Sequence, residues 1–154
     1  MRRFFLLVLA AVMAFEAFAG TPAEDLVGRH ADVKGARHIE VRGAKMKFAR
    51  PILRRFPIGP LADEVTEVTA LNLGKTSAAD KERFLMDMTK TLQQYRYYGK
   101  SDTPNGIVDV YIHLYSDSIV DELVIFNPEL NVLNILDGKF SVKDLLKLDN
   151  SPDK

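Results

Sequence analysis

Residues 105–138 constrain the fold more than any other part of the chain, because three β-like runs follow one another there. The runs read IVDVYIHLYS, IVDELVIFN and LNVLNILD, and short turn-forming segments separate them. Runs rich in Val, Ile and Tyr between such turns are typical of strands joined by hairpins. The stretch therefore predicts an antiparallel three-stranded meander.

The first of these runs has two unlike faces. One face is wholly apolar and consists of Val108, Val110, Ile112 and Leu114. Alternating residues of a strand point to opposite sides of a sheet, so this face is predicted to lie against the core. The opposite face carries Asp109, Tyr111, His113 and Tyr115, and it becomes a candidate binding face if it is open.

Other segments supply the rest of the predicted domain. Residues 38–42 and 65–73 alternate like strands, whereas residues 44–56, 77–98 and 141–148 space their apolar side chains like helices. The order β-α-β-α-β-β-β-α predicts an α+β domain over residues 38–148. Helices between the early strands favour parallel pairs, so we expect a two-layer fold with a mixed sheet and helices mainly on one face.

The N-terminus has the pattern of a secretory signal peptide. Arg2 and Arg3 precede an apolar run over residues 4–15, and Ala17-Phe18-Ala19 places small residues where a signal peptidase cuts. The alternative is an uncleaved membrane anchor, but a spanning helix needs about 20 apolar residues. The sequence predicts a signal peptide over residues 1–19, with no transmembrane segment left after cleavage. The product would be periplasmic or secreted.

Composition excludes several kinds of chemistry. The chain contains no cysteine, which rules out a lipidated N-terminal cysteine, a thiol nucleophile and Cys-type zinc sites. Lys and Arg together number 21, as do Asp and Glu, so no bulk charge attracts nucleic acid. Residues 20–37 show no period and predict a flexible lead-in in which His30 is solvated, and residues 149–154 form a polar tail.

Charge is nevertheless segregated along the chain. Residues 29–56 contain nine Lys or Arg and two acids, whereas residues 101–138 contain seven acids and no Lys or Arg. One interpretation is that the two regions form ion pairs in the fold. The other is a basic helix face, at Lys47, Arg50 and Arg54, that meets an acidic protein, a phosphate or anionic lipid.

No motif for catalysis or metal binding is present. The three histidines, His30, His38 and His113, lack the spacing that places two ligands on one face, and no G-x-S-x-G elbow occurs. His38, Glu40, Asp109 and His113 could converge only if their two strands were neighbours. We therefore expect no enzyme activity, no cofactor and no metal.

Three segments resemble a bacterial exported family, the domain of unknown function 4252. They are VRGAKMKFARPIL, ELVIF in the meander and ILDGKFSVKDLLKL at the end. The likeness spans residues 41–148. It implies no activity, catalytic residue or cofactor, and this chain differs from the members that look like lipoproteins because it lacks cysteine.

The functional expectation is a non-enzymatic binding or interaction module of the bacterial envelope, with another envelope protein as its partner. Two alternatives stay open. The face around Tyr111 and His113 would serve a small-ligand carrier or an enzyme. The basic helix would serve association with a membrane surface.

Overall fold

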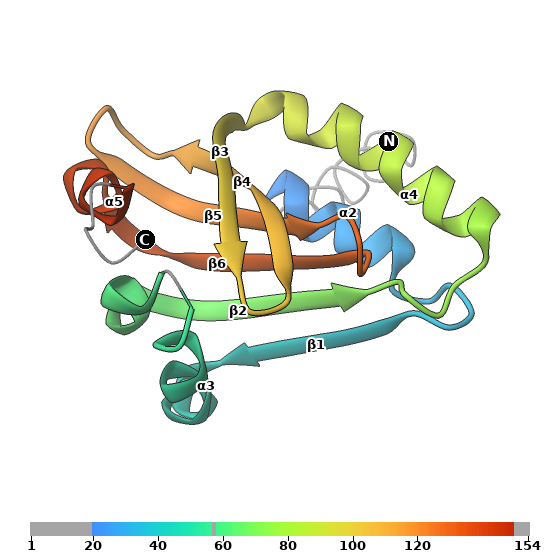
Figure 1. Ribbon diagram of the computed structural model, residues 1–154, viewed down its shortest axis with the longest axis horizontal. Helices are drawn as coiled ribbons and strands as arrows, with labels where there is room; N and C mark the ends of the chain where they lie inside the picture. Colours follow the sequence, from blue (N-terminus) through green and yellow to red (C-terminus); the bar gives the residue numbers. More distant parts are fainter. Residues whose placement is uncertain (1–19, 57, 150–154) are drawn as a thin grey trace, which may run out of the picture.

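A six-stranded sheet forms the centre of the computed structural model, which describes residues 20–56 and 58–149. The predicted signal peptide and residues 150–154 of the predicted tail lie outside the described residues. In the order β1-β2-β6-β5-β4-β3 (Figure 1), the strands are β1 (Arg37–Arg42), β2 (Val65–Asn72), β6 (Val132–Ser141), β5 (Ile119–Asn127), β4 (Gly106–Leu114) and β3 (Arg96–Thr103).

Every pair of neighbouring strands is antiparallel, so the α+β class is confirmed but the mixed sheet is wrong. The error comes from interpreting each helix as a crossover between parallel strands. Residues 43–64 instead form a long helical connection between the antiparallel strands β1 and β2, and β6 pairs with the other edge of β2. The predicted meander is confirmed as β4, β5 and β6.

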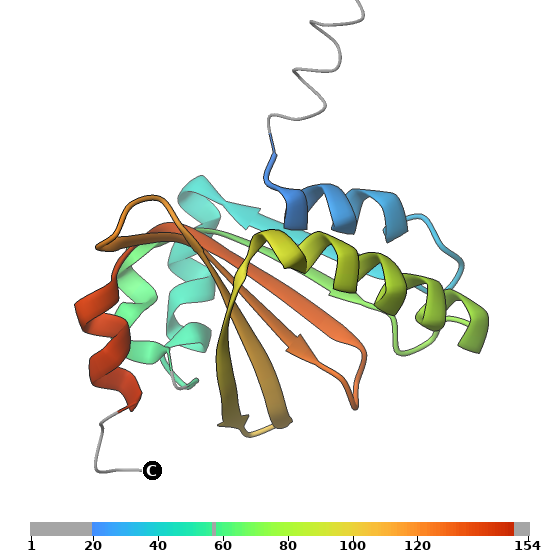
Figure 2. The same cartoon turned by 90° about the horizontal axis from the view of Figure 1, so that it is seen from above.

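Helices pack on both sides of the sheet rather than mainly on one. Helices α2 (Pro22–His30) and α4 (Ala78–Thr91) lie side by side on one face, and the 3-10 turn η3 (Leu92–Gln94) follows α4 (Figure 2). At one end of the sheet, the other face is covered by η1 (Gly43–Lys45), α3 (Met46–Leu53), η2 (Gly59–Glu64) and α5 (Val142–Asp149).

Two clusters of buried side chains match the two sides. The first contains Leu26 of α2 and Phe84 of α4 with Val124 and Ile135 of the sheet. The second contains Met46 of α3 with Ile112, Phe140 and other side chains of the opposite face. Since Ile112 is 6% exposed, the face predicted to be apolar does contribute to a core.

The predicted flexible lead-in is wrong for Pro22–His30, which is a capped helix. The Thr21 hydroxyl accepts a bond from the Glu24 N–H, and the Glu24 carboxylate accepts one from the Thr21 N–H. With a proline in the first turn, this is a complete capping box. Ala23 and Leu26 are fully buried, so α2 belongs to the folded unit.

The helix predicted over residues 77–98 ends earlier than expected. Helix α4 stops at Thr91, and Tyr97 and Tyr98 belong to strand β3, which the sequence analysis missed. Strand β3 pairs with β4 through a turn that ends at Gly106, with a bulge between Tyr97 and Gly99. Gly99 has φ +140° in this bulge, a backbone conformation that favours glycine.

Replacing Leu26 by Ala tests whether α2 is integral to the domain. We expect the free energy of unfolding to fall by about 2–4 kcal/mol, because the change leaves a cavity in the first core cluster. Met86→Ala is the control on α4, since that side chain is 59% exposed and its loss should cost under about 0.5 kcal/mol. Equal effects of the two changes in denaturant titrations would contradict the docking of α2.

Candidate functional site

The four residues of the sheet face predicted from sequence contact different neighbours in the structure. Asp109 Oδ1 accepts hydrogen bonds from the Tyr97 hydroxyl at 2.9 Å and from Lys100 Nζ at 2.8 Å. The rings of Tyr97 and Tyr111 meet edge to face with centroids 5.2 Å apart, and Tyr111 packs against the first core cluster. Two members of the predicted face are thus engaged with neighbouring side chains.

The other two members differ sharply in their surroundings. His113 Nδ1 lies 2.7 Å from Asp121 Oδ1, and its ring centroid lies 5.5 Å from that of Tyr95. Tyr115 follows the end of β4 and is 73% exposed. Because α2 and α4 lie on the side of the sheet that Tyr111 faces, the four residues do not form one open row.

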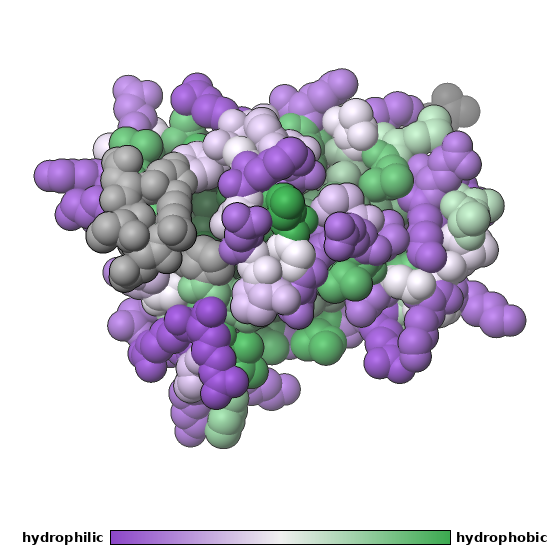
Figure 3. Space-filling model, viewed as in Figure 1, coloured by the Kyte–Doolittle hydropathy of each residue, from purple (hydrophilic) through white to green (hydrophobic). Residues whose placement is uncertain are grey.

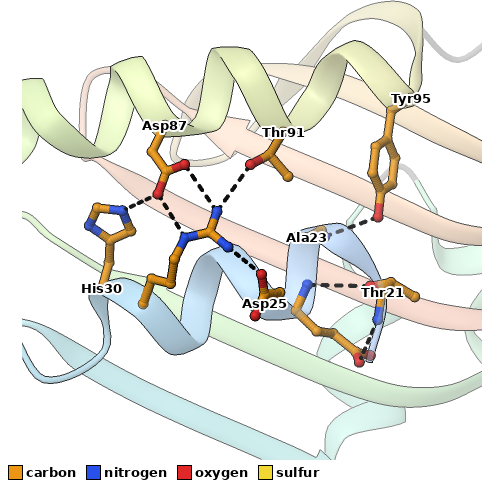
Figure 4. A network of polar contacts seen from close by, with 9 residues as sticks. Thr21, Ala23, Asp25, His30, Asp87, Thr91 and Tyr95 are labelled. Atoms are coloured by element: carbon orange, nitrogen blue, oxygen red, sulfur yellow. Dashed lines mark hydrogen bonds and ion pairs between the residues drawn. The ribbon is translucent and has the colours of Figure 1, made fainter. Parts of the chain in front are cut away.

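A polar network joins α2 to α4 (Figure 4). Arg29 donates to both carboxylate oxygens of Asp87 at 3.0 Å, and His30 Nε2 lies 2.8 Å from Asp87 Oδ2. The hydrogen bond from Arg29 lowers the pKa of Asp87. His30 was expected in solvent, but its side chain is 13% exposed and its role is structural.

A group of carboxyls lies beneath the start of α2. Glu122 of β5 is fully buried, Asp137 of β6 is opposite it in register, and Glu24 reaches them from α2. Glu67 of β2 pairs with Asp137 on the other side. Bulges at residues 65–67 and 120–122 set this register, so three adjacent strands bring acidic residues together.

Glu122 receives two hydrogen bonds from outside its strand. The Thr21 hydroxyl donates to Oε2 at 2.5 Å, and the Tyr95 hydroxyl donates to Oε1. The Ala23 N–H donates to the same tyrosine oxygen at 3.1 Å. Burial and the adjacent Glu122 charge raise the pKa of Tyr95, which keeps its hydroxyl a proton donor.

Asp137 is held in its protonated form. Burial, followed by hydrogen bonding to Glu122 and Glu24, raises the pKa of Asp137 to about 10. Its Oδ2 is buried and accepts no hydrogen bond from the described residues. A proton on this carboxyl makes it a donor to the neighbouring carboxylates, as in other pairs of close acids.

The same carboxyls could in principle bind a cation, since the oxygens of Glu24, Glu122 and Asp137 lie within 4.8 Å of one another. Calcium takes about 6–8 oxygen ligands. Both oxygens of Glu122 already accept hydrogen bonds. A shared proton therefore explains the group without an ion, and we assign it a structural role.

The predicted basic face is only partly available. Arg50 turns inward and donates to the Val65 carbonyl at 3.3 Å, and Arg54 pairs with Asp63 at 2.7 Å. Lys47 is exposed, and its Nζ lies 5.4 Å from the centre of the Phe48 ring. Of the three residues named from sequence, Lys47 alone is exposed and outside the ion pairs formed among described residues.

The outer side of α3 instead presents a stripe of four residues: Lys45, Phe48, Ile52 and Arg55. We call it the α3 stripe. Phe48 is 70% exposed and Ile52 is 59% exposed, and the lysine and arginine flank them along the chain. In Figure 3, hydrophilic and hydrophobic surfaces lie next to one another over α3.

The two charged regions of the chain do not neutralise each other. Among the described residues, the ion pairs of the basic segment go to Asp25, Asp87, Glu40 and Asp63. None of these pairs within residues 20–56 and 58–149 involves the seven acids of residues 101–138. The interpretation that the two regions pair in the fold is therefore wrong.

Sequence reasoning missed Glu122 and Phe48 as residues of interest. Glu122 lies in the apolar run IVDELVIF, where a buried acid signals either a bulge or a polar partner. Phe48 lies within residues 44–56, whose apolar side chains were taken only as evidence for a helix. The flanking Lys45, Lys47 and Arg55 were the available sign that it faces solvent.

Replacing Asp137 by Asn tests the shared proton, because it should change how the free energy of unfolding depends on pH. A pKa that is higher in the folded state than in the unfolded state gives stability that is present below about pH 4 and lost as pH rises toward the folded pKa. We expect wild-type stability to decline between about pH 5 and pH 9, by about 0.5 kcal/mol per unit after allowing for solvent screening.

The Asp137→Asn variant imitates the protonated acid and should flatten that decline. Urea titrations of both proteins at several pH values measure the difference. Parallel slopes in the two proteins would show that Asp137 ionises normally. Asp102→Asn is the control, because that exposed acid lies outside the group of carboxyls.

Comparison with known proteins leaves the chain without an assigned relative. No family model, curated protein or solved structure matches it. Within the described residues, no helix is long and apolar enough to cross a membrane.

Proposed function

We propose that this protein is an exported, non-enzymatic binding module of the bacterial envelope and that it engages its partner through the α3 stripe. The observation that carries the proposal is the pair of exposed apolar side chains, Phe48 and Ile52, flanked by Lys45 and Arg55. Single exposed apolar residues are ordinary, but grouped ones bordered by charge mark contact surfaces.

Packing of α3 does not require these side chains. The helix attaches to the second core cluster through Met46, which is 1% exposed, with Ala49 and Leu53 beside it. Phe48 and Ile52 lie on the other side. Most of their apolar surface stays in water in the folded protein, so covering it by a partner would be favourable.

The edge strand β1 extends this surface. Ile39 is 61% exposed, β1 contacts α3, and the strand pairs with β2 on one side. Arg37 and Arg42 lie at its two ends. The charge of the whole region is positive, which favours a partner with an anionic surface.

Export is part of the proposal and rests on the predicted signal peptide. Cleavage after Ala19 would leave Gly20 and Thr21 ahead of α2, and Thr21 is the residue that caps this helix. A cut at this position would keep every contact of the Thr21 side chain with Glu24 and Glu122. The predicted cut is therefore compatible with an intact domain.

The carrier or enzyme alternative has less support. It depends on an open face at Tyr111 and His113, but Tyr111 packs against the first core cluster and His113 is bonded to Asp121. The packing of Tyr111 and the bond between His113 Nδ1 and Asp121 give the two side chains structural roles.

Replacing the two apolar side chains of the stripe by acidic ones tests the proposal in the host cell. We expect wild-type protein to sediment with washed envelopes and the F48D/I52D variant to remain in the supernatant, with at least about a fivefold loss of the bound fraction. The exposed positions make similar folding of both proteins the expectation, checked by circular dichroism.

M86D/I107D is the matched control, because it replaces two apolar residues that are 59% and 51% exposed on other elements. It should bind like wild type. Equal sedimentation of F48D/I52D and wild type, or no sedimentation of wild type at all, would refute binding through the α3 stripe.

A further inference from the structure

The residues of the α3 stripe occur at spacings of three, four and three along the chain, so they lie on one side of the helix. Hydrogen bonds from the Arg54, Arg55 and Phe56 N–H groups back to α3 continue the helical turn past Leu53. The apolar pair therefore occupies the middle of the stripe, and a cation stands at each end.

The chain segment that contains the stripe carries a surplus of positive charge. No Asp or Glu occurs between Val41 and Ala62, and Asp63, the first acid after this stretch, is paired with Arg54. Lys45, Lys47 and Arg55 are exposed and belong to no ion pair among the described residues. A partner that covers these three cations would therefore need several negatively charged groups.

The stripe lies along the outer side of a helix at one end of the sheet. Helix α3 lies beyond β1 at one end of the sheet (Figure 1), and its buried side, with Met46, faces the second core cluster. A flat, deformable anionic surface can contact the outer side of a helix directly, whereas a folded acidic protein would need a groove that matches the helix. The geometry favours the flat surface.

Lipid bilayers offer the two chemistries that the stripe requires. Phe and Ile side chains partition into the boundary between headgroups and acyl chains, while Lys and Arg remain among the phosphates. Basic side chains close to an anionic leaflet are attracted within a Debye length. Helix α3 has eight residues, so it would lie on the bilayer and not cross it.

We propose that the α3 stripe docks this protein onto an anionic lipid bilayer, with Phe48 and Ile52 inserted at the headgroup boundary and Lys45, Lys47 and Arg55 among the phosphates. This inference rests on the proposed function, because it names the partner of the same surface. An acidic protein partner is the competing outcome, and the experiment below separates the two.

The chain contains no tryptophan, so a single introduced one reports its own surroundings. Phe48→Trp is placed in the exported form purified from the host and mixed with vesicles of phosphatidylcholine containing about one third phosphatidylglycerol. We expect the emission of the introduced tryptophan to move to shorter wavelength and to be quenched by brominated acyl chains. Vesicles of phosphatidylcholine alone should produce neither change.

Two further variants make the result specific. Met86→Trp, a reporter on α4, should show no shift with the same vesicles, since α4 and α3 lie on opposite faces of the sheet. Adding K45E/K47E to the F48W protein should weaken vesicle binding at least about tenfold. High salt should weaken the binding of the F48W protein as well, because its electrostatic part is screened.

Unchanged emission of the F48W protein with anionic vesicles, or the same shift with neutral ones, overturns the lipid inference. If the washed envelopes still bind the protein through Phe48 and Ile52 in that case, the proposed function stands with an acidic protein as partner. If neither envelopes nor vesicles bind it, both proposals fall.

Discussion

The two carboxylate oxygens of Glu122 connect three distant parts of the chain, and the rest of the fold depends on that junction. Thr21 at the start of α2 donates to one oxygen, and Tyr95 at the end of η3 donates to the other. A fully buried carboxylate is costly to leave unbonded. The position of α2, the entry into β3 and the middle of β5 are therefore fixed together.

The two faces of the sheet differ in how their helices are packed. On the α2–α4 side, ion pairs and apolar packing join the two helices to each other and to the sheet. On the α3–α5 side, α3 packs through one face and leaves Phe48 and Ile52 exposed. We place binding on the α3 side, where two exposed apolar side chains lie between exposed cations on one helix.

The sequence pattern predicted the elements that interactions between residues close along the chain determine. The meander, strand β2 and the capped start of α4 at Ser77 follow from alternation, turn residues and a capping hydroxyl. The capping box at Thr21 and Glu24 was visible in the sequence as well, but α2 has only nine residues and a short apolar stripe at Ala23, Leu26 and Val27. Strand β3 was hidden because Tyr97 and Tyr98 also continued the helical spacing of α4.

The candidate sites depended on contacts that sequence does not show. The alternation of β4 correctly placed Asp109, Tyr111 and His113 on one face, but which helices cover that face is decided by long-range packing. Gly138 lies beside both bulges that align Glu122 with Asp137, but one glycine near the end of a predicted strand does not show which residues it brings together. The segregation of charge along the chain was predicted correctly. Whether the two charged regions pair with each other could be decided only from the ion pairs in the structure.

The place of β6 in the sheet has a consequence for how the chain folds. Strand β6 separates β2 from β5, and Asn72 pairs with Val132 far along the chain. Until β6 is present, the facing edges of β2 and β5 both lack their partner, and pairing across so long a loop is slow. The sheet closes only when almost the whole chain is free to move, so a chain threaded across a membrane would stay unfolded until its last strand had emerged.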